Sequence, residues 1–392
     1  MYQRTSDLSK MAQPADPLIG RDILDGQFKI LEKIGSGGMG AVYKALQPEM
    51  NRMVAVKVLH KKLIGRKDAA SRFRREARAL SHLTHPNTVR VLMYGELDDG
   101  SMYIVMEFLE GKNLHQLVRA NGPLRLERAI FILVQACGAL EEAHRAGMIH
   151  RDLKPENIFV CRQGGINDFA KVLDFGLAKV TQKELRPGSI MLTQEGMVFG
   201  TPEFMAPEQA QGKSLTPASD VYSLAIILYE AITGKLPFEG KNPMDFLQMH
   251  VTEPPIRLND RDVHLEFPQE LENVIERALS KDPEKRYASA LEFGDALMAA
   301  VPIPSISRMP SVARVPEGAR TTAPMLGAPK LPISTPPVRS STPLVSGPSS
   351  ETDRGSVAPR VPKSSGSFYV GVVVAFLFGI ALTIFLTKFL AK

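Results

Sequence analysis

Four polar residues in two short segments have the types and the spacing needed to transfer a phosphoryl group. Asp152, Lys154 and Asn157 lie within residues 150–157, which read HRDLKPEN, and Asp174 begins a downstream Asp-Phe-Gly run. The reaction needs an acceptor that orients the attacking hydroxyl, a lysine near the transferred group and two oxygen ligands for magnesium. In that order, the chain supplies Asp152, Lys154, Asn157 and Asp174.

A glycine-rich run lies far upstream of these residues. Residues 35–42 read GSGGMGAV and stand between two strand-like segments, 28–34 and 41–46. A dinucleotide-binding turn would need a helix directly after the third glycine, and the residues there are typical of a strand instead. The run therefore predicts a hairpin whose backbone amides close over phosphate groups, with an ordinary hairpin turn as the alternative.

Lys57 ends the apolar run Val-Ala-Val-Lys, where an ammonium group is costly unless an anion lies nearby. Glu76, on a predicted helix over 72–83, is the expected counter-charge. The alternative for either residue is a surface ion pair that contributes little.

The elements that must position these groups change in type along the chain. Strand-like alternation gives way to long helical periodicity after residue 126. A small β-rich lobe is thus expected to precede a larger helical lobe. The predicted strands cover 28–34, 41–46, 53–59 and 102–108, and the predicted helices cover 72–83, 126–146, 219–233 and 271–279.

Composition limits the class of protein. With 392 residues and 44% hydrophobic content, the chain can bury a large core. The net charge of +6 comes from interleaved charges rather than basic runs, so a nucleic-acid partner is not expected. Cys137 and Cys161 each lie in an apolar stretch and are expected to be free, buried thiols.

The end of the chain has a different character. Residues 302–367 are rich in Pro, Ser and Thr and are expected to form a disordered linker, which could be a spacer or a docking platform. Phe368 to Thr387 are twenty uncharged residues, which as a helix would span about 30 Å and cross a membrane. A buried core helix is the alternative. Small residues recur at Gly371, Ala375 and Gly379, which favours a homodimer through that helix face, although small residues are common in membrane helices.

Residues 28–301 resemble a eukaryotic-type (Hanks-type) Ser/Thr protein kinase domain, bacterial-like in its detail. Besides the motifs above, the resemblance rests on the Ala-Pro-Glu run that ends at Glu208, on Asp220 and on Arg286. It implies an α+β, bilobal kinase fold and an enzyme that uses ATP and Mg²⁺ to phosphorylate protein substrates. Lys154 and the Gly-Thr-Pro-Glu run at 200–203 resemble Ser/Thr rather than tyrosine kinases.

The resemblance also implies a role for each matched residue. Asp152 would be the catalytic base, assisted by Lys154, with Lys57 paired to Glu76 and holding the α and β phosphates. Asn157 and Asp174 would bind the metal. Arg286 would pair with Glu208. The ATP site would be formed by Ile34, Gly35, Ser36, Gly37, Gly38, Met39, Gly40, Val42, Ala55, Lys57, Met106, Glu107, Leu109 and Phe159.

Regulation and location complete the expectations. Arg151 beside the catalytic aspartate suggests activation by autophosphorylation, with Thr193 as the first candidate and Ser189 and Thr181 behind it. Thr201 is expected to contact the catalytic loop instead. A catalytically silent membrane scaffold is the alternative function, opposed by the complete catalytic set.

The expected organisation is a single-pass membrane protein whose kinase domain is cytoplasmic. The predicted parts are an N-terminal tail over 1–27, the kinase domain over 28–301, the linker over 302–367, the transmembrane helix over 368–387 and a short tail over 388–392.

Overall fold

The computed structural model describes residues 16–37, 40–59, 67–175, 201–262 and 265–301. Gly38, Met39, Thr193 and the apolar segment 368–387 lie outside these ranges, so the predictions made for them stay predictions. Within the described ranges, no helix is both long and apolar enough to cross a membrane.

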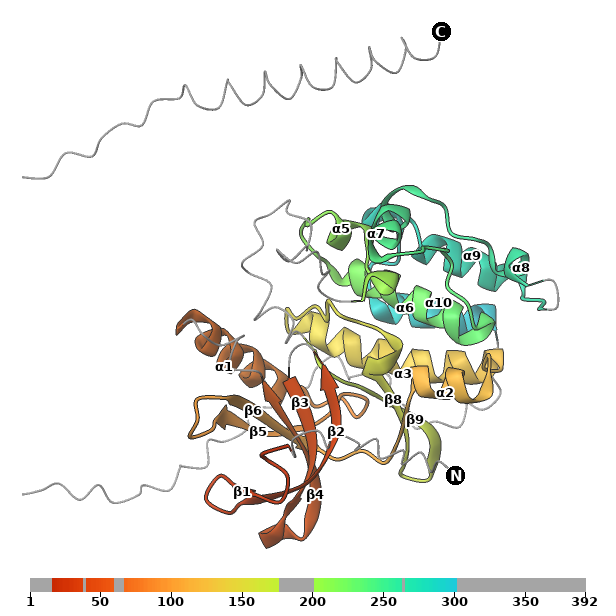
Figure 1. The fold of residues 1–392 in the computed structure, drawn as a ribbon. Helices are drawn as coiled ribbons and strands as arrows, with labels where there is room; N and C mark the ends of the chain where they lie inside the picture. The colour runs from red at the N-terminus through yellow and green to blue at the C-terminus, as the bar shows by residue number, and fades with distance from the viewer. Residues whose placement is uncertain (1–15, 38–39, 60–66, 176–200, 263–264, 302–392) are drawn as a thin grey trace, which may run out of the picture. The chain divides into compact units, whose positions relative to one another are not determined.

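The first part of the chain forms a six-stranded antiparallel sheet with the order β1-β2-β3-β4-β6-β5 and one helix, α1 (Figure 1). Helix α1 spans Lys67–Ser81, so it begins five residues before the predicted start at 72. The strands are β1 (Asp22–Ile23), β2 (Phe28–Gly37), β3 (Gly40–Gln47), β4 (Arg52–Leu59), β5 (Val91–Glu96) and β6 (Met102–Glu107).

The glycine-rich run joins β2 to β3. Gly35, Gly37 and Gly40 are part of the strands themselves, because Gly35 pairs with Val42 and Gly37 pairs with Gly40 in the antiparallel register. The predicted hairpin is confirmed, and β2 is longer than the predicted strand, because backbone pairing continues where the side-chain alternation stops.

The second part of the chain is mostly helical, as the change in periodicity predicted. Helix α3 packs against α6, and α6 is buried along almost its whole length. The helices are α2 (Leu114–Asn121), α3 (Leu126–Arg145), α5 (Pro207–Ala210), α6 (Pro217–Thr233), α7 (Pro243–Thr252), α8 (Leu258–Arg261), α9 (Gln269–Ala278) and α10 (Ala290–Ala300). Short 3-10 turns are η1 (Pro48–Met50), η3 (Pro155–Asn157), η4 (Pro202–Phe204) and η5 (Pro283–Lys285).

A small three-stranded sheet carries the two segments that are predicted to be catalytic. Its order is β7-β8-β9, with β7 at Gly111–Asn113, β8 at Ile158–Gln163 and β9 at Ile166–Val172. The segment 150–157 leads directly into β8, and Asp174 follows two residues after β9. The paired strands therefore bring these two segments together at one end of the sheet.

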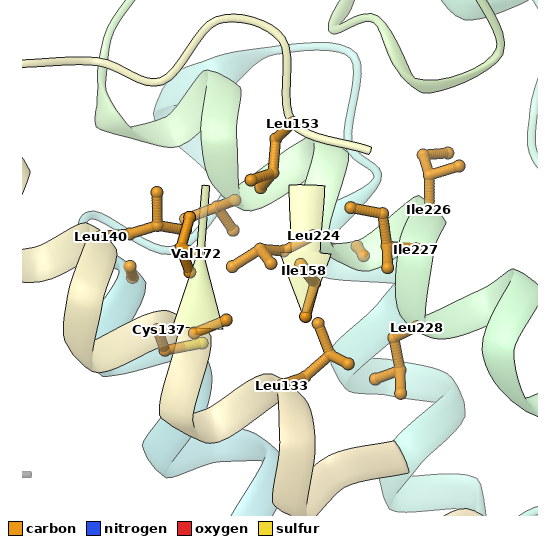
Figure 2. Packing of buried hydrophobic residues seen from close by; sticks show 14 of the residues in the cluster. Leu133, Cys137, Leu140, Leu153, Ile158, Val172, Leu224, Ile226, Ile227 and Leu228 are labelled. Carbon is orange, nitrogen blue, oxygen red and sulfur yellow. The ribbon is translucent and has the colours of Figure 1, made fainter. Parts of the chain in front are cut away.

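One large apolar cluster supports this sheet. Figure 2 shows side chains of α3, β8, β9 and α6 gathered together with Leu153, which stands between Asp152 and Lys154. Leu153 is 3% exposed and Val172 is fully buried. The loop 150–157 is thus fixed to the core through its own apolar residue. Cys137 and Cys161 are both buried and free, as expected.

Candidate active site

The predicted catalytic pair is in contact in the structure. Lys154 Nζ lies 3.4 Å from Asp152 Oδ2 and donates a hydrogen bond of 3.2 Å to Thr201 Oγ1. The contact expected for Thr201 is therefore confirmed. Both Asp152 and Lys154 are partly exposed, so the carboxylate and the ammonium group can reach a bound molecule while they hold each other in place.

Asn157 is fixed in orientation by the loop that carries Asp152. Its Nδ2 donates to the Asp152 carbonyl at 2.7 Å, and its own carbonyl accepts from the amide of Leu173 at 2.8 Å. The side-chain amide can point its nitrogen in only one direction, so its oxygen is directed away from the loop backbone. That oxygen is the atom that can bind a hard cation.

Asp174 is held by Lys57, at 2.7 Å between Nζ and Oδ1. Burial by itself would raise the pKa of this carboxyl, but Lys57, with smaller effects of His150 and Lys154, lowers it below its usual value. Asp174 has a φ of 60°, a left-handed conformation that is unusual for a residue other than glycine. Its carboxylate is therefore ionised and positioned at neutral pH.

The ion pair of Lys57 with Asp174 was not predicted from the sequence, which indicated Glu76 as the partner. Glu76 is buried on α1, at 8% exposure, as a residue paired inside the fold would be. The Lys57–Glu76 pair stays a prediction, whereas Lys57–Asp174 was not foreseen. The two residues come from separate lobes, and no spacing in the sequence indicates their contact.

Asp220 anchors the backbone at the start of the segment 150–157. Its carboxylate accepts the backbone amides of His150 and Arg151 at 2.8 and 3.1 Å, and His144 Nε2 lies 2.7 Å away. Burial would raise the pKa of Asp220, but the contacts with His144 and His150 lower it. Arg151 has a φ of 69°, and the two bonds to Asp220 help to hold that strained backbone.

Three of the residues expected around adenine, Val42, Ala55 and Met106, lie on adjoining strands of the large sheet. Ala55 of β4 is the register partner of Met106 in β6, and Val42 of β3 is the register partner of Lys57. Phe159 lies on β8 and is half-buried, as is Leu109 after β6. Phe159 is thus on the smaller sheet and Leu109 follows β6, and contact of all five residues with a nucleotide stays a prediction.

Glu107 carries an ion pair that sequence reasoning missed. Its Oε1 lies 2.7 Å from Nζ of Lys171, a lysine of β9 that is only 4% exposed. Its backbone amide donates to the Arg90 carbonyl at 3.0 Å. Of the backbone groups of Glu107, only the carbonyl is thus left to accept a hydrogen bond from a nucleotide, and the predicted place of Glu107 in the ATP site stays a prediction.

The glycines of the β2–β3 hairpin differ in whether the surrounding structure leaves room for a side chain. A Cβ on Gly40 would stand 2.1 Å from the Val58 carbonyl oxygen, whereas a Cβ on Gly37 would meet nothing within 4 Å. Gly40 is thus required by the close approach of β4. Gly35 and Gly37 stay candidates for phosphate contact, as does Ser36 beside them, and Ile34 is 47% exposed.

Glu208 and Arg286 form the buried pair that was expected. Two parallel hydrogen bonds of 2.8 Å join the guanidinium to the carboxylate, and Ser219 Oγ donates to Glu208 at 2.6 Å. Burial would raise the pKa of Glu208, but Arg286 and Ser219 lower it. The prediction is confirmed.

Three carboxylates gather next to the catalytic loop. Burial, reinforced by Glu156 and Glu203, raises the pKa of Glu230 on α6 to about 7. One oxygen of Glu156 and one of Glu203 are buried without a hydrogen-bond partner. No spacing in the sequence indicates this group, since its members come from three separate segments.

The side-chain oxygens of Asn157 and Asp174 fit a magnesium ion that is bound by the protein and by a nucleotide together. Asp174 offers a positioned, ionised carboxylate, and Asn157 offers an amide oxygen fixed by the Asp152 carbonyl. Among the described residues, no group of three or more His, Cys, Asp or Glu forms a cage that could hold a metal by itself. Two oxygen ligands beside a phosphate site are what Mg²⁺ accepts, because it keeps water and substrate oxygens as its other ligands.

Comparison with known proteins agrees with this geometry. A model of the protein kinase domain family matches residues 28–295, which is more than half of the chain. The chain belongs to the protein kinase family. The two lobes are therefore the two lobes of a kinase domain, while the roles predicted for residues 150–157 and 174–176 stay predictions.

Several relatives of the kinase come from bacteria. The serine/threonine-protein kinase pkn3 of Myxococcus xanthus is 43% identical over 284 residues, which cover 72% of this chain and 51% of pkn3. PknA of Mycobacterium tuberculosis is 39% identical over 280 residues, which cover 70% of this chain and 62% of PknA. The chain thus spans about half the length of the curated relatives it matches.

A solved structure shows the same fold. The crystallised PknI kinase domain of Mycobacterium tuberculosis superimposes with a TM-score of 0.55 at 25% sequence identity, covering 72% of this chain and 98% of that domain.

Proposed function

We propose that the kinase transfers the γ-phosphoryl group of ATP to Ser or Thr hydroxyls of proteins. The observation that carries this proposal is the contact of Lys154 with both Asp152 and Thr201, beside an Asp174 that Lys57 holds ionised. The names of the bacterial relatives support the choice of serine and threonine.

Each group has a chemical task in this reaction. Asp152 orients the acceptor hydroxyl and takes its proton, because its carboxylate is positioned and partly exposed. Lys154 neutralises charge that develops on the transferred group, and Lys57 binds the phosphates of the nucleotide. Mg²⁺, when bound by Asn157 and Asp174, would screen the phosphate charges and orient the phosphoryl group.

A silent scaffold is not favoured. A protein that only binds partners has no need for Asp152, Lys154, Asn157 and Asp174 to be kept in a strained and hydrogen-bonded arrangement. Strained backbone at Arg151 and Asp174 costs folding free energy and is found mainly at functional sites.

The test is phosphate transfer from labelled ATP and magnesium to dephosphorylated casein by the full chain. Asp152→Asn should lower transfer by about 10³-fold or more, because the proton acceptor is lost. Asp260→Asn, an exposed carboxylate on α8, is the matched control and should leave transfer unchanged. Equal activity of the Asp152 variant and the wild type would contradict the mechanism.

Activation by autophosphorylation is part of the proposal. Arg151 is adjacent to Asp152, where a guanidinium can bind a phosphate on the segment between Asp174 and Glu208. Thr193 is the preferred acceptor, followed by Ser189 and Thr181. Dephosphorylated Thr193→Ala should stay at the basal rate after incubation with ATP, and full activation of that variant would rule Thr193 out.

We also propose that residues 368–387 attach the protein to a membrane. The support is the length and apolarity of this stretch, which suit the hydrocarbon core of a bilayer. The catalytic domain would then face the cytoplasm, where ATP is available. Deletion of 368–387 should move the protein from the carbonate-resistant membrane fraction to the supernatant.

Self-association through the same helix is the finer proposal. The small residues Gly371, Ala375 and Gly379 repeat every four positions and would let two helices approach closely. Replacement of all three by Ile should reduce dimer formation in a membrane reporter assay, and unchanged dimer formation would remove this idea.

A further inference from the structure

The turn η4, Pro202–Phe204, lies next to the proposed catalytic pair. Thr201, the residue that precedes the turn, accepts the hydrogen bond from Lys154, and Lys154 contacts Asp152. Any acceptor hydroxyl that reaches Asp152 must therefore pass close to this turn. The turn backbone therefore lies where it can contact an acceptor protein.

Two buried side chains fix the backbone carbonyls of that turn. Ser223 Oγ on α6 donates to the Phe204 carbonyl at 2.7 Å. His250 on α7 has its Nε2 at 3.1 Å from the Glu203 carbonyl. The middle and the end of the turn are thus bonded to two different helices of the lobe.

The protonation of His250 follows from its partners. A carbonyl oxygen can only accept, so Nε2 carries the hydrogen, and Nδ1, at 2.9 Å from the Tyr222 hydroxyl, accepts from that hydroxyl. Burial, with the nearby charge of Lys281, lowers the pKa of His250 to about 3, so the ring is neutral under ordinary conditions. Tyr222, His250 and the Glu203 carbonyl form one directed chain of hydrogen bonds.

The ring has no freedom to turn away from the carbonyl. His250 is fully buried. The rings of Phe238 and Tyr222 pack edge-on against it, with centroids 4.8 and 5.6 Å away. Packing alone would be served equally well by a phenyl group, so the donor nitrogen is the feature that needs another explanation.

We propose that His250 is a positioning residue for the acceptor protein. Through its Nε2–H bond to the Glu203 carbonyl, it holds the turn 202–204 in the conformation that presents a substrate hydroxyl to Asp152. This inference rests on the proposed kinase function, and it assigns to helix α7 a part in acceptor binding that the catalytic motifs do not contain.

Two substitutions separate the hydrogen bond from the packing. His250→Phe keeps an aromatic ring but removes the donor. His250→Gln keeps a donor nitrogen three bonds from Cβ, as in histidine, so it can still reach the Glu203 carbonyl. Thr252→Val is the control on the same helix, because the Thr252 hydroxyl bonds to the Gln248 carbonyl and to Glu253 rather than to the turn.

The measurements use the full chain with ATP, magnesium and dephosphorylated casein. His250→Phe should raise KM for casein by about 3- to 10-fold, as expected when one hydrogen bond that fixes a binding surface is lost. KM for ATP and the acceptor-independent hydrolysis of ATP should stay within about twofold of the wild type. His250→Gln should recover most of the affinity for casein, and Thr252→Val should behave as the wild type.

Hydrogen exchange gives a readout that does not depend on activity. The amides of Phe204 and Met205 bond to the carbonyls of Thr201 and Pro202 within the turn. Their exchange should become faster in His250→Phe, while amides of α3 and α6 stay protected. His250→Gln should exchange at nearly the wild-type rate.

The outcomes distinguish this inference from the proposed function. If the wild type transfers no phosphate but the exchange pattern is as expected, the kinase function fails and the contact that holds the turn stands. Unchanged exchange and unchanged KM for casein in folded His250→Phe would overturn the positioning role. Equal effects of the Phe and Gln variants on both readouts would overturn it as well.

Discussion

At the scale of single residues, the site depends on acidic groups with opposite environments. Asp174 and Asp220 are surrounded by donors and cations, so their pKa values are lowered and both are ionised. Glu230 instead lies near two other carboxylates, and burial together with Glu156 and Glu203 raises its pKa to about 7. The two carboxylates with a lowered pKa stabilise the folded state at neutral pH, whereas ionisation of Glu230, whose pKa is raised, destabilises it.

Glu230→Gln is expected to stabilise the protein at pH 8 relative to wild type. A raised pKa means that the contribution of Glu230 is fully present below about pH 4.5 and is lost as the pH rises through about 7. The neutral amide avoids that loss, so the gain should be on the order of 1–2 kcal/mol at pH 8 and should shrink toward pH 5. Urea unfolding at the two pH values measures this difference.

The control for this prediction is Glu276→Gln, an exposed glutamate on α9. It should shift the unfolding free energy by less than about 0.5 kcal/mol at either pH. A Glu230→Gln gain that is the same at pH 5 and pH 8 would show that titration of this carboxyl is not its cause.

At the scale of elements, the β2–β3 hairpin combines two requirements in one glycine-rich run. Gly40 is needed because β4 passes within contact distance of its backbone, and this holds without any nucleotide. Gly37 pairs with Gly40 across the hairpin and has open space around it. Of these two glycines in one motif, Gly40 is therefore required for strand packing, whereas Gly37 is free to contact a ligand.

Gly40→Ala should destabilise the protein by about 2–4 kcal/mol, because the added methyl group must displace the backbone carbonyl of Val58. Gly37→Ala is the matched control and should change the unfolding free energy by less than about 1 kcal/mol. Chemical denaturation of both variants tests this, and equal losses in the two would mean that the close approach of β4 is not what selects glycine at position 40.

At the scale of the whole molecule, ion pairs join segments that are far apart in the chain. Glu208 and Arg286 fix the end of the segment that follows the catalytic motifs to the loop before α10. Arg286 also donates to the carbonyls of Ser280 and Ala218. A guanidinium with all of its donors in use can be buried, whereas the same group without its carboxylate cannot.

Glu208→Gln should therefore cost about 3–5 kcal/mol of unfolding free energy, because it leaves the buried Arg286 charge without its counter-ion. Glu96→Gln is the control, since Glu96 pairs with Arg74 at a similar distance of 2.7 Å but both side chains are about half exposed. That exposed pair should contribute less than about 1 kcal/mol. Comparable losses from both substitutions, measured by urea unfolding, would contradict the role assigned to burial.

The sequence by itself determined much of the fold and most of the candidate site. The alternation before residue 60 and the long helical periodicity after residue 126 predicted the two lobes, because burying one face of a strand or a helix imposes those periods. The spacing of Asp152, Lys154 and Asn157 was also sufficient to predict that they lie close together in space, since residues so close in sequence are brought together by a single loop. The helix boundaries were off by a few residues, because helix ends depend on local capping and packing.

Only the tertiary structure decided which distant groups meet. The bond from Lys57 to Asp174, the reason for glycine at position 40 and the contact of His250 with the Glu203 carbonyl all join separate elements. Periodicity reports which face of an element is buried, but not which residue of another element lies against it. For that reason the candidate catalytic residues could be proposed from the sequence, whereas the groups that hold them in position required the folded chain.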